Sequence, residues 1–309
     1  MPPRPTLYKE LNYNGKTIVI REPYSTRDYR ELMDVQLRIW GMPDYSEAVT
    51  YHMIIAAHRN GGVVLGAFEK DTGKAVGVIY GVPAYKDGMI YVYSHLAGVV
   101  PEYRFKGLGY EMKLIQRKIA LEKGYRLIKW TYDPMQSANA YFNICKFGVV
   151  VRKFYEDYYG ELQDEINRGM PSDRFEAEWW ISSRRVEKVL AGEVKHPSLN
   201  DLLEHGAYLV NNVVFEDNIP RIEEYSLSSS SDLVLVEIPG SLDEIRKKSR
   251  ELVLDWRMKL RRIFNYYLNE MGYIVTWFIS FVENNVRRSY YVLWRRSLEK
   301  ILEGELPWS

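Results

Sequence analysis

The sequence predicts an α/β fold of the α+β kind: a mixed, mostly antiparallel sheet flanked by helices, followed by a smaller C-terminal β-α-β-β unit. Segments typical of strands and of helices alternate through residues 16–182. Short turns, such as Asp71-Thr72-Gly73-Lys74, join consecutive strand segments into antiparallel hairpins. A strand–helix–strand crossover over residues 89–132 adds a parallel pair, so the sheet is mixed. Hydrophobic residues make up 46% of the chain and charged residues 27%, which is typical of a chain that buries a core.

The first part of the chain is expected to form the larger sheet, a domain of residues 1–182. Thr26 is expected to cap a helix that ends at Trp40, since Gly41 and Pro43 follow it. Gly124 is likewise expected to end the helix of the crossover. The predicted order is β-α-α-β-β-β-α-β-α-β-β, over residues 16–21, 26–40, 46–59, 63–69, 75–82, 89–100, 107–123, 125–132, 137–147, 149–155 and 175–181.

The remaining residues are expected to form a linker and a smaller unit. Residues 183–232 are less periodic and end near a run of serines, which favours a linker or loop region. Ser241 and Glu244 form a capping-box pattern that opens a long helix over residues 241–271. Strand segments at 233–238, 273–282 and 287–294 complete a C-terminal α/β unit, residues 233–309, with Asn284-Asn285 as its hairpin turn.

Composition excludes several classes of protein. The formal net charge is +1, which gives no case for nucleic acid or an anionic membrane as the partner. Cys145 is the single cysteine, so no disulfide can form within the chain, and a reducing, cytoplasmic location is expected. The first residues lack the apolar core of a signal peptide, and no stretch approaches the ~18 apolar residues of a membrane span. No metal site is expected.

The residues from Val99 to Tyr110 form the clearest functional pattern. A strand segment runs into a loop that contains Gly107 and Gly109, and the loop runs into a helix. Backbone N–H groups at the start of a helix form an anion site, and glycine lets the backbone approach a phosphate closely. Arg104 and Lys106 add positive charge, so a pyrophosphate is the expected ligand. Spacing alone would also suit a tight strand-to-helix turn without a ligand.

In this loop the chain resembles a known family. Arg104-x-x-Gly107-x-Gly109 resembles the Gln/Arg-x-x-Gly-x-Gly/Ala signature of the GNAT superfamily of acyl-CoA N-acyltransferases, and the predicted element order is the GNAT order over residues 16–182. A less studied branch of predicted GNAT acetyltransferases is similar in a further set of motifs: Ser94-His95, Trp130-Thr131-Tyr132-Asp133-Pro134, Asn139-Ala140, Asn143, Gly148 and Asn167-Arg168-Gly169.

This resemblance implies a function and a division of roles. Acetyl-CoA or another acyl-CoA would be the co-substrate, and the acceptor would be an amine of a small molecule or amino acid that attacks the thioester directly. The main chain of Val99 would pair with the pantetheine arm, in a gap where the strands at 89–100 and 125–132 separate. The amides that would hold the pyrophosphate are those of Arg104, Phe105, Lys106, Gly107, Leu108, Gly109 and Tyr110. A protein acetyltransferase and a non-catalytic acyl-CoA sensor are the alternatives, and a homodimer is possible.

Two residues are candidates for the base that takes the proton of the amine. GNAT enzymes often carry a carboxylate on the strand before the loop, whereas this chain offers His95 there. Strict alternation would place Tyr91, Tyr93, His95, Ala97 and Val99 on one face of that strand. The alternative is a core histidine bonded to a backbone carbonyl. Asp133, after the next strand, is the second candidate, or else a turn residue before Pro134.

The acid that protonates the leaving thiolate is harder to assign. Many GNAT enzymes use a tyrosine in the fourth helix, but Ile144 occupies that position here, and Tyr141 lies three residues earlier. Tyr141, Tyr158, Tyr159 or water would then serve. Asn139 and Asn143 are expected on one helix face, where an amide could bond the coenzyme's arm or simply lie on the surface. Cys145 is expected to be a buried structural thiol rather than a nucleophile.

Overall fold

The computed structural model describes residues 6–13, 15–160, 169–216, 219–228 and 230–308. The chain forms two compact units: unit 1 contains Met1–Trp130 and Glu161–Gly169, and unit 2 contains Thr131–Gly160 and Met170–Ser309. The boundaries of these units do not coincide with the predicted ones at residues 182 and 232. The chain first crosses from unit 1 to unit 2 between Trp130 and Thr131, within a strand. Asn167 and Arg168, two of the residues in the family resemblance, lie outside the described residues.

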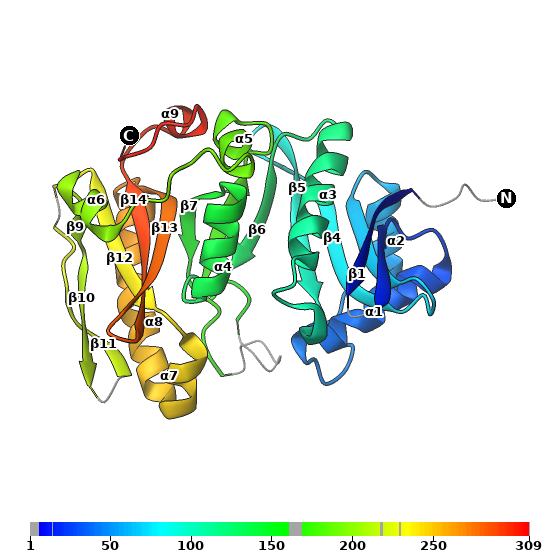
Figure 1. Ribbon diagram of the computed structural model, residues 1–309, viewed down its shortest axis with the longest axis horizontal. Helices are drawn as coiled ribbons and strands as arrows, with labels where there is room; N and C mark the ends of the chain where they lie inside the picture. Colours follow the sequence, from blue (N-terminus) through cyan, green and yellow to red (C-terminus); the bar gives the residue numbers. More distant parts are fainter. Residues whose placement is uncertain (1–5, 14, 161–168, 217–218, 229, 309) are drawn as a thin grey trace. The chain divides into compact units, whose positions relative to one another are not determined.

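Unit 1 is a mixed sheet with helices on both faces (Figure 1). Its strand order is β1-β2-β3-β4-β5-β6, antiparallel except for the parallel pair β5–β6. A Cβ added at Gly77 would meet Met112, and one added at Gly98 would meet Ile39, so α3 and α1 cover opposite faces. The elements are β1 (Leu7–Tyr13), β2 (Lys16–Arg21), α1 (Thr26–Trp40), α2 (Tyr51–Arg59), β3 (Val63–Glu69), β4 (Ala75–Lys86), β5 (Met89–Val99), α3 (Leu108–Glu122) and β6 (Ile128–Tyr132).

The first helix shows how local sequence sets its ends. Ser25, not the predicted Thr26, caps α1: its side chain accepts a hydrogen bond from the amide of Asp28, whose carboxylate returns one to the amide of Ser25. Gly41 ends the helix in the left-handed conformation, with φ 64°. The predicted cap is therefore displaced by one residue, while the predicted end is confirmed.

A β-bulge lies in the middle of β5. Gly81 pairs with Ser94 and Tyr80 pairs with Leu96, which leaves His95 as the extra residue between them. A bulge residue interrupts the alternation of side chains between the two faces of the sheet. Odd-numbered residues before the bulge and after it therefore point to opposite faces.

The bulge changes which side chains of β5 share a face. Before it, Ser94 lies on the α3 face, since it accepts a hydrogen bond from Gln116 of that helix. After it, Val99 lies on the α3 face as well, because a Cβ at Gly77 would meet both Val99 and Met112. The prediction that Tyr91, Tyr93, His95, Ala97 and Val99 share one face is therefore wrong.

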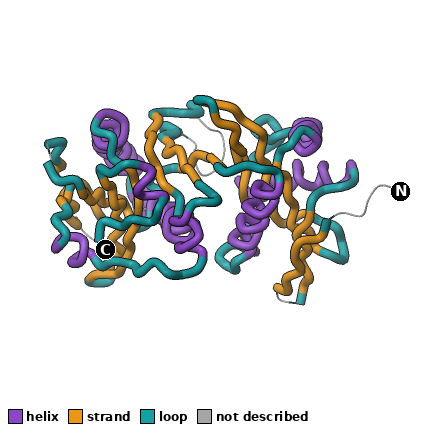
Figure 2. The backbone as a smooth tube through the Cα atoms, turned by 90° about the horizontal axis from the view of Figure 1, so that it is seen from above, coloured by secondary structure: helices purple, strands orange, loops and turns teal. Residues whose placement is uncertain are grey.

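Unit 2 contains the remaining strands, in the order β8-β7-β13-β14-β12-β9, and a separate hairpin, β10–β11. Residues 183–232, predicted as a linker, contain helices and strands, and Val186, Leu202 and Ile222 among them are buried. In Figure 2 the helices of this unit (purple) lie beside its strands (orange). The strands are β7 (Val150–Tyr155), β8 (Arg174–Trp179), β9 (Tyr208–Leu209), β10 (Asn211–Glu216), β11 (Ile219–Tyr225), β12 (Leu233–Pro239), β13 (Ile274–Glu283) and β14 (Val286–Trp294).

One of the two helices predicted in unit 2 is divided into two. The single helix expected over 241–271 is divided at Ser249, which ends α7 and caps α8. The helices are α4 (Ser137–Tyr141) with the π-helical turn η2 (Phe142–Lys146), α5 (Arg184–Leu190), α6 (Leu199–Glu204), α7 (Leu242–Lys248), α8 (Arg250–Phe264) with the π-helical turn η3 (Asn265–Glu270), and α9 (Leu298–Leu302).

One structural motif occurs twice in unit 2. In each copy a helix finishes in a π-helical turn, a glycine with positive φ follows, and an antiparallel hairpin comes next. The first copy runs from α4 through Gly148 to β7 and β8, and the second runs from α8 through Gly272 to β13 and β14. The glycines have φ values of 70° and 71°. Each hairpin is then interrupted by a bulge at the equivalent position, Arg152 in one and Thr276 in the other.

The two copies contact each other through equivalent residues. Val151 pairs with Val275, and each lies three residues after the glycine of its own copy. Reciprocal pairing of equivalent residues is the property of an interface with two-fold symmetry. The C-terminal half of unit 2 is therefore a structural duplicate of its first half, which agrees with the β-α-β-β order predicted for the C-terminal residues.

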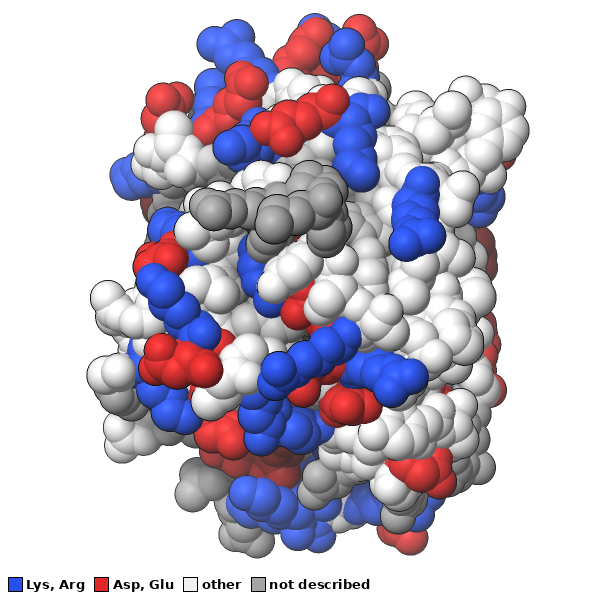
Figure 3. Space-filling model, turned by 90° about the vertical axis from the view of Figure 1, so that its right-hand side faces the viewer, with Lys and Arg blue, Asp and Glu red and all other residues white. Residues whose placement is uncertain are grey.

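Among the described helices, none combines the length and the apolar character that crossing a lipid bilayer requires. Acidic and basic side chains are interspersed over the face that Figure 3 shows. Ion pairs join many of them in unit 1, for example Lys16 with Glu69 and Lys70 with Glu10. This face therefore agrees with the near-neutral total charge.

Candidate active site

The loop before α3 has the backbone geometry of an anion site. A short 3-10 turn, η1 (Pro101–Tyr103), follows β5, and Gly107 is the N-cap of α3 with φ 87° and no side-chain cap. The amides of Leu108 and Gly109 lie in the first turn of α3, where no preceding turn supplies a carbonyl acceptor. A Cβ added at Gly107 or at Gly109 would meet no atom of the described residues within 4 Å. The backbone therefore borders open space on the side where these glycines lack a side chain.

The two cationic side chains of the loop stabilise its shape. Arg104 donates hydrogen bonds to the carbonyls of Ile39, at 2.5 Å, and Val99, at 3.4 Å. Lys106 donates to the carbonyl of Glu102 at 2.8 Å. Their charges stay beside the loop, but their hydrogen bonds are made to the chain itself. Between them, Phe105 has φ 59° and its side chain is 96% exposed.

The strands β5 and β6 separate after a short region of contact. They pair in parallel at two positions, Val92 with Ile128 and Tyr93 with Lys129. From Ser94 onward, no pairing of β5 with β6 is found among the described residues of unit 1. This edge of β5 leads to Val99, whose carbonyl accepts from Arg104, and then to the glycine loop. A strand edge without a partner strand is where an extended ligand can add as a further strand. Within unit 1 the pairing thus ends at Tyr93 and Lys129, in the region where these strands were predicted to separate.

A buried polar chain lies at the point where β5 and β6 separate. Lys113 of α3 donates a hydrogen bond to Gln116 at 2.8 Å, and Gln116 donates to Ser94 of β5 at 2.9 Å. The Lys113 nitrogen also lies 3.7 Å from the ring centroid of Trp130 of β6. Burial lowers the pKa of Lys113 from 10.5 to about 7. Lys113 is not among the residues predicted from the sequence, although a lysine among the apolar helix residues Met112, Ile115 and Ile119 is a visible signal.

His95 occupies the bulge itself. The residue is solvent accessible, and its ring centroid lies 6.2 Å from those of Tyr80 and Tyr93. Partial burial of the imidazole among these neighbours lowers the pKa of His95 below its ordinary value of 6.5. The ring is therefore neutral at neutral pH and able to accept a proton.

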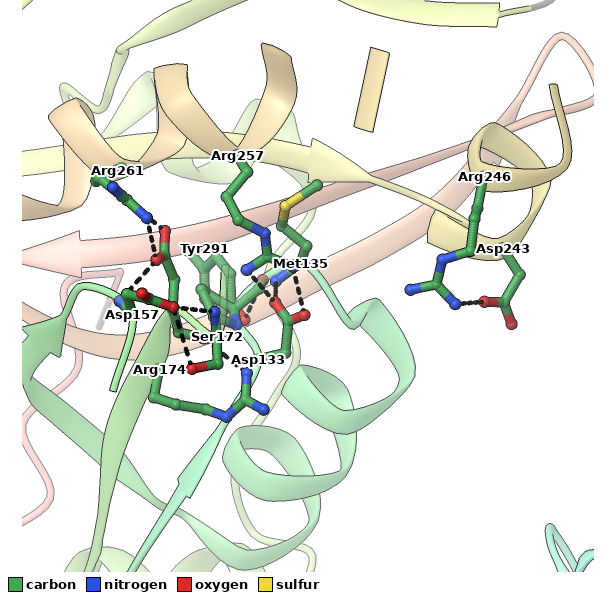
Figure 4. A network of polar contacts seen from close by, with 12 residues as sticks. Asp133, Met135, Asp157, Ser172, Arg174, Asp243, Arg246, Arg257, Arg261 and Tyr291 are labelled. Carbon is green, nitrogen blue, oxygen red and sulfur yellow. Dashed lines mark hydrogen bonds and ion pairs between the residues drawn. The ribbon is translucent and has the colours of Figure 1, made fainter. Parts of the chain in front are cut away.

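Asp133 is buried in an ion pair within unit 2. Arg257 of α8 holds both of its carboxylate oxygens, at 2.7 and 3.3 Å, and the amide of Met135 donates to it at 2.9 Å (Figure 4). The side chains of Arg257 and Asp133 are only 3% and 9% exposed. Asp133 is also the turn residue before Pro134 that the sequence analysis gave as its alternative role. A carboxylate with these partners connects α8 to the end of β6.

The predicted residues of the fourth helix lie in different surroundings. Tyr141 is partly exposed, its ring stacks on that of His196 at 6.3 Å, and the Lys146 nitrogen lies 5.6 Å from its centroid. Asn139 is exposed whereas Asn143 is buried, so the two amides do not form one surface pair. Tyr158 and Tyr159 are exposed, and the Tyr159 hydroxyl contacts that of Thr131 at 3.1 Å.

Cys145 is a buried structural thiol. It is 5% exposed, its thiol donates to the carbonyl of Phe278 at 3.1 Å, and burial raises its pKa to about 12. In the second copy of the duplicated motif, the equivalent Asn269 donates to the carbonyl of Phe154 at 2.9 Å. The thiol thus occupies a structural position of the interface between the two copies.

We expect Cys145→Ala to retain the activity of the chain and to lower the free energy of unfolding by about 1 kcal/mol, the usual cost of a lost buried contact. Denaturant unfolding and a thiol-reagent assay measure this. Native Cys145 should react with a thiol reagent only after unfolding, since the thiolate is the reactive form. Rapid labelling of the folded chain would contradict this assignment.

Among the described residues, no group of three or more His, Cys, Asp or Glu side chains is placed to hold a metal ion. The loop, the open edge of β5 and His95 lie together in unit 1, with the Lys113 chain at the point of strand separation. This arrangement can bind an anion at the helix, hold an extended arm along the strand and remove a proton beside it.

No family model matches the chain, and no curated protein matches it. Solved structures do match, each over about half of this chain. An acetyltransferase of the GNAT family from Streptococcus pneumoniae is 18% identical over 52% of this chain and 98% of its own, with a TM-score of 0.41. Arabidopsis thaliana Naa50, solved with a bisubstrate analogue of coenzyme A, is 17% identical over 52% of this chain and 97% of its own, also with a TM-score of 0.41.

The ribosomal-protein-S18-alanine N-acetyltransferase of Escherichia coli is 13% identical over 53% of this chain and 94% of its own, with a TM-score of 0.40. Two of these three structures are named as acetyltransferases, and one of the two is assigned to the GNAT family.

Proposed function

We propose that this chain is an acyl-CoA-dependent N-acyltransferase that moves an acetyl or short acyl group from coenzyme A to an amine of a small molecule or amino acid. One observation carries the proposal: the edge of β5 is followed, after η1 and the glycine loop, by a helix start whose glycines border open space among the described residues. The edge suits the amide groups of pantetheine, and the helix start suits the pyrophosphate. The single cysteine, buried and unpaired, fits a reducing compartment such as the cytoplasm.

His95 is our candidate base. Its place in the bulge puts it on the strand that would carry the coenzyme's arm, and its lowered pKa keeps the imidazole neutral. Asp133 is less suited, because its two oxygens are held by Arg257. Direct attack needs no covalent enzyme intermediate, which agrees with the burial of Cys145. Tyr141 remains a candidate acid, and Asn139 and Asn143 remain candidates for contact with the coenzyme.

Gly107→Val tests the coenzyme loop. We expect acetyl-CoA to stabilise the wild-type chain by ~2.7 kcal/mol at a concentration a hundred times the Kd, seen as a higher melting temperature. In Gly107→Val this stabilisation should be lost, because the new side chain fills the open space beside the helix start. Calorimetry or a thermal-shift assay with and without acetyl-CoA measures the difference.

Gly124→Val is the matched control. Gly124 follows the other end of α3, has φ 84° against 87° for Gly107, and also borders open space. Both variants therefore bear the same backbone strain, and only Gly107→Val should lose the ligand effect. An unchanged acetyl-CoA effect in Gly107→Val would rule out this loop as the coenzyme site. Release of free coenzyme A thiol in the presence of a panel of amines then tests turnover.

A further inference from the structure

Lys113 lies at the apex of the gap between β5 and β6. The last paired residues of these strands are Tyr93 and Lys129, so Ser94 and Trp130 are the first residues after they separate. The Lys113 nitrogen is 3.7 Å from the Trp130 ring centroid and is connected to Ser94 through Gln116. The amine of Lys113 therefore contacts β6 directly and is linked to β5 through Gln116.

This position is an unfavourable one for a lysine. Lys113 is 5% exposed and Gln116 is fully buried, while the neighbouring residues Met112, Ile115 and Ile119 of the helix are apolar and pack on the sheet. A methionine or leucine would fill the site without the cost of burying a charge. Buried ionisable groups are frequently functional, because burial adjusts their proton affinity. Here burial brings the pKa of Lys113 to about 7.

We infer that Lys113 is the general acid of the proposed reaction, and that its ammonium protonates the coenzyme A sulfur as the thioester breaks. The inference rests on the proposed function. The acceptor amine forms a bond to the thioester carbonyl carbon, the C–S bond breaks, and its electron pair goes to sulfur. Lys113 gives one proton to that sulfur and becomes a neutral amine, and the surplus proton of the acceptor goes to His95. Solvent then restores the proton of Lys113.

The alternatives on the fourth helix have other surroundings, within unit 2. The side chain of Ile144 is fully buried and has no ionisable group that could donate a proton. The ring of Tyr141 lies against the ring of His196 and the ammonium of Lys146. By contrast, Lys113 belongs to the same unit as the loop and the open edge of β5. The other titratable or charged groups on the elements around it are Glu69 on β3, Tyr80, Tyr85 and Lys86 on β4, Tyr91, Tyr93 and His95 on β5, Lys129 and Tyr132 on β6, and Tyr110, Glu111, Arg117, Lys118 and Glu122 on α3.

The test is the pH dependence of acetyl transfer by Lys113→Met. In the wild type, kcat should rise as His95 loses its proton and fall as pH increases through the pKa of Lys113, because the acid must be protonated. Lys113→Met should lower kcat by roughly 10²–10⁴-fold and remove the alkaline fall. Its thermal shift with acetyl-CoA should equal that of the wild type. Lys118→Met is the matched control, since Lys118 lies on the same helix and its side chain is 64% exposed.

Gln116→Glu gives an independent readout. A carboxylate in place of the amide that accepts from Lys113 would favour the ammonium, so the alkaline fall should move to higher pH. A purely structural lysine would leave the position of that fall unchanged. The inference is overturned if Lys113→Met keeps the wild-type rate and alkaline fall, or if Tyr141→Phe alone removes the fall. A wild-type chain that binds acetyl-CoA without any acetyl transfer would overturn the proposed function as well, and this outcome appears before any variant is made.

Discussion

Arg257→Met is expected to lower the free energy of unfolding by about 3–5 kcal/mol, because it leaves the carboxylate of Asp133 buried without its counter-ion. Arg257 supplies two of the hydrogen bonds to that carboxylate, and Met135 supplies a third. The arginine side chain is 3% exposed and the aspartate 9%, so water does not replace the lost partner. Denaturant unfolding, followed by tryptophan fluorescence, measures the loss.

Two further variants test whether the loss of stability comes from the buried, unpaired carboxylate of Asp133. Arg246→Met removes the exposed pair of Arg246 with Asp243 in the same unit, at 3.3 Å with 71% of the aspartate side chain exposed, and should cost less than about 1 kcal/mol. Combining Arg257→Met with Asp133→Asn removes both charges and should recover most of the loss. A cost for Arg257→Met no larger than that of Arg246→Met would show that water reaches Asp133.

The elements predicted correctly have signals that are local in the sequence. The glycine loop is one such element, because Gly107 is required where the chain turns into α3 with positive φ. The end of α1 at Gly41 is another. In both cases the residue type alone determines the local backbone, so no knowledge of distant neighbours is needed.

The bulge at His95 has no such signal. Tyrosine, valine, serine and histidine around it suit either face of a half-buried strand, and the extra residue is specified only by pairing with Gly81 and Tyr80 of β4. The candidate base was therefore found by residue type, while its surroundings were predicted incorrectly. The same reason applies to residues 183–232, where β9 is a strand only through its pairing with β12.

The duplicated motif of unit 2 is invisible in the sequence for a different reason. Equivalent positions have different side chains that make the same contact: Cys145 and Asn269 each donate to a backbone carbonyl of the other copy. A backbone acceptor does not require a particular donor, so the residues diverge while the geometry stays the same. The glycines at 148 and 272 are the shared signal, because both positions need positive φ.

The second large effect concerns Lys113 and stability. Lys113→Met is expected to raise the free energy of unfolding by roughly 4–5 kcal/mol below pH 7, and by little above pH ~10.5. The folded pKa of Lys113 is about 7 and its ordinary value is 10.5. Between these values the unfolded chain holds a proton that the folded chain does not hold, so wild-type stability from this group increases with pH. Methionine removes that penalty while filling a similar volume.

The measurement is denaturant unfolding of wild type and Lys113→Met at several pH values from 6 to 10. Other titrating groups act equally in both proteins, so the difference in their free energies of unfolding reports on Lys113 alone. This difference should shrink by ~1.4 kcal/mol per pH unit through most of the range. Lys118→Met, on the exposed side of α3, should show no such trend. A constant difference would mean that Lys113 keeps its ordinary proton affinity in the folded chain, and it would then be a poor acid at neutral pH. A shrinking difference, together with the loss of acetyl transfer in the same variant, would show that the chain retains a destabilising amine for its chemistry.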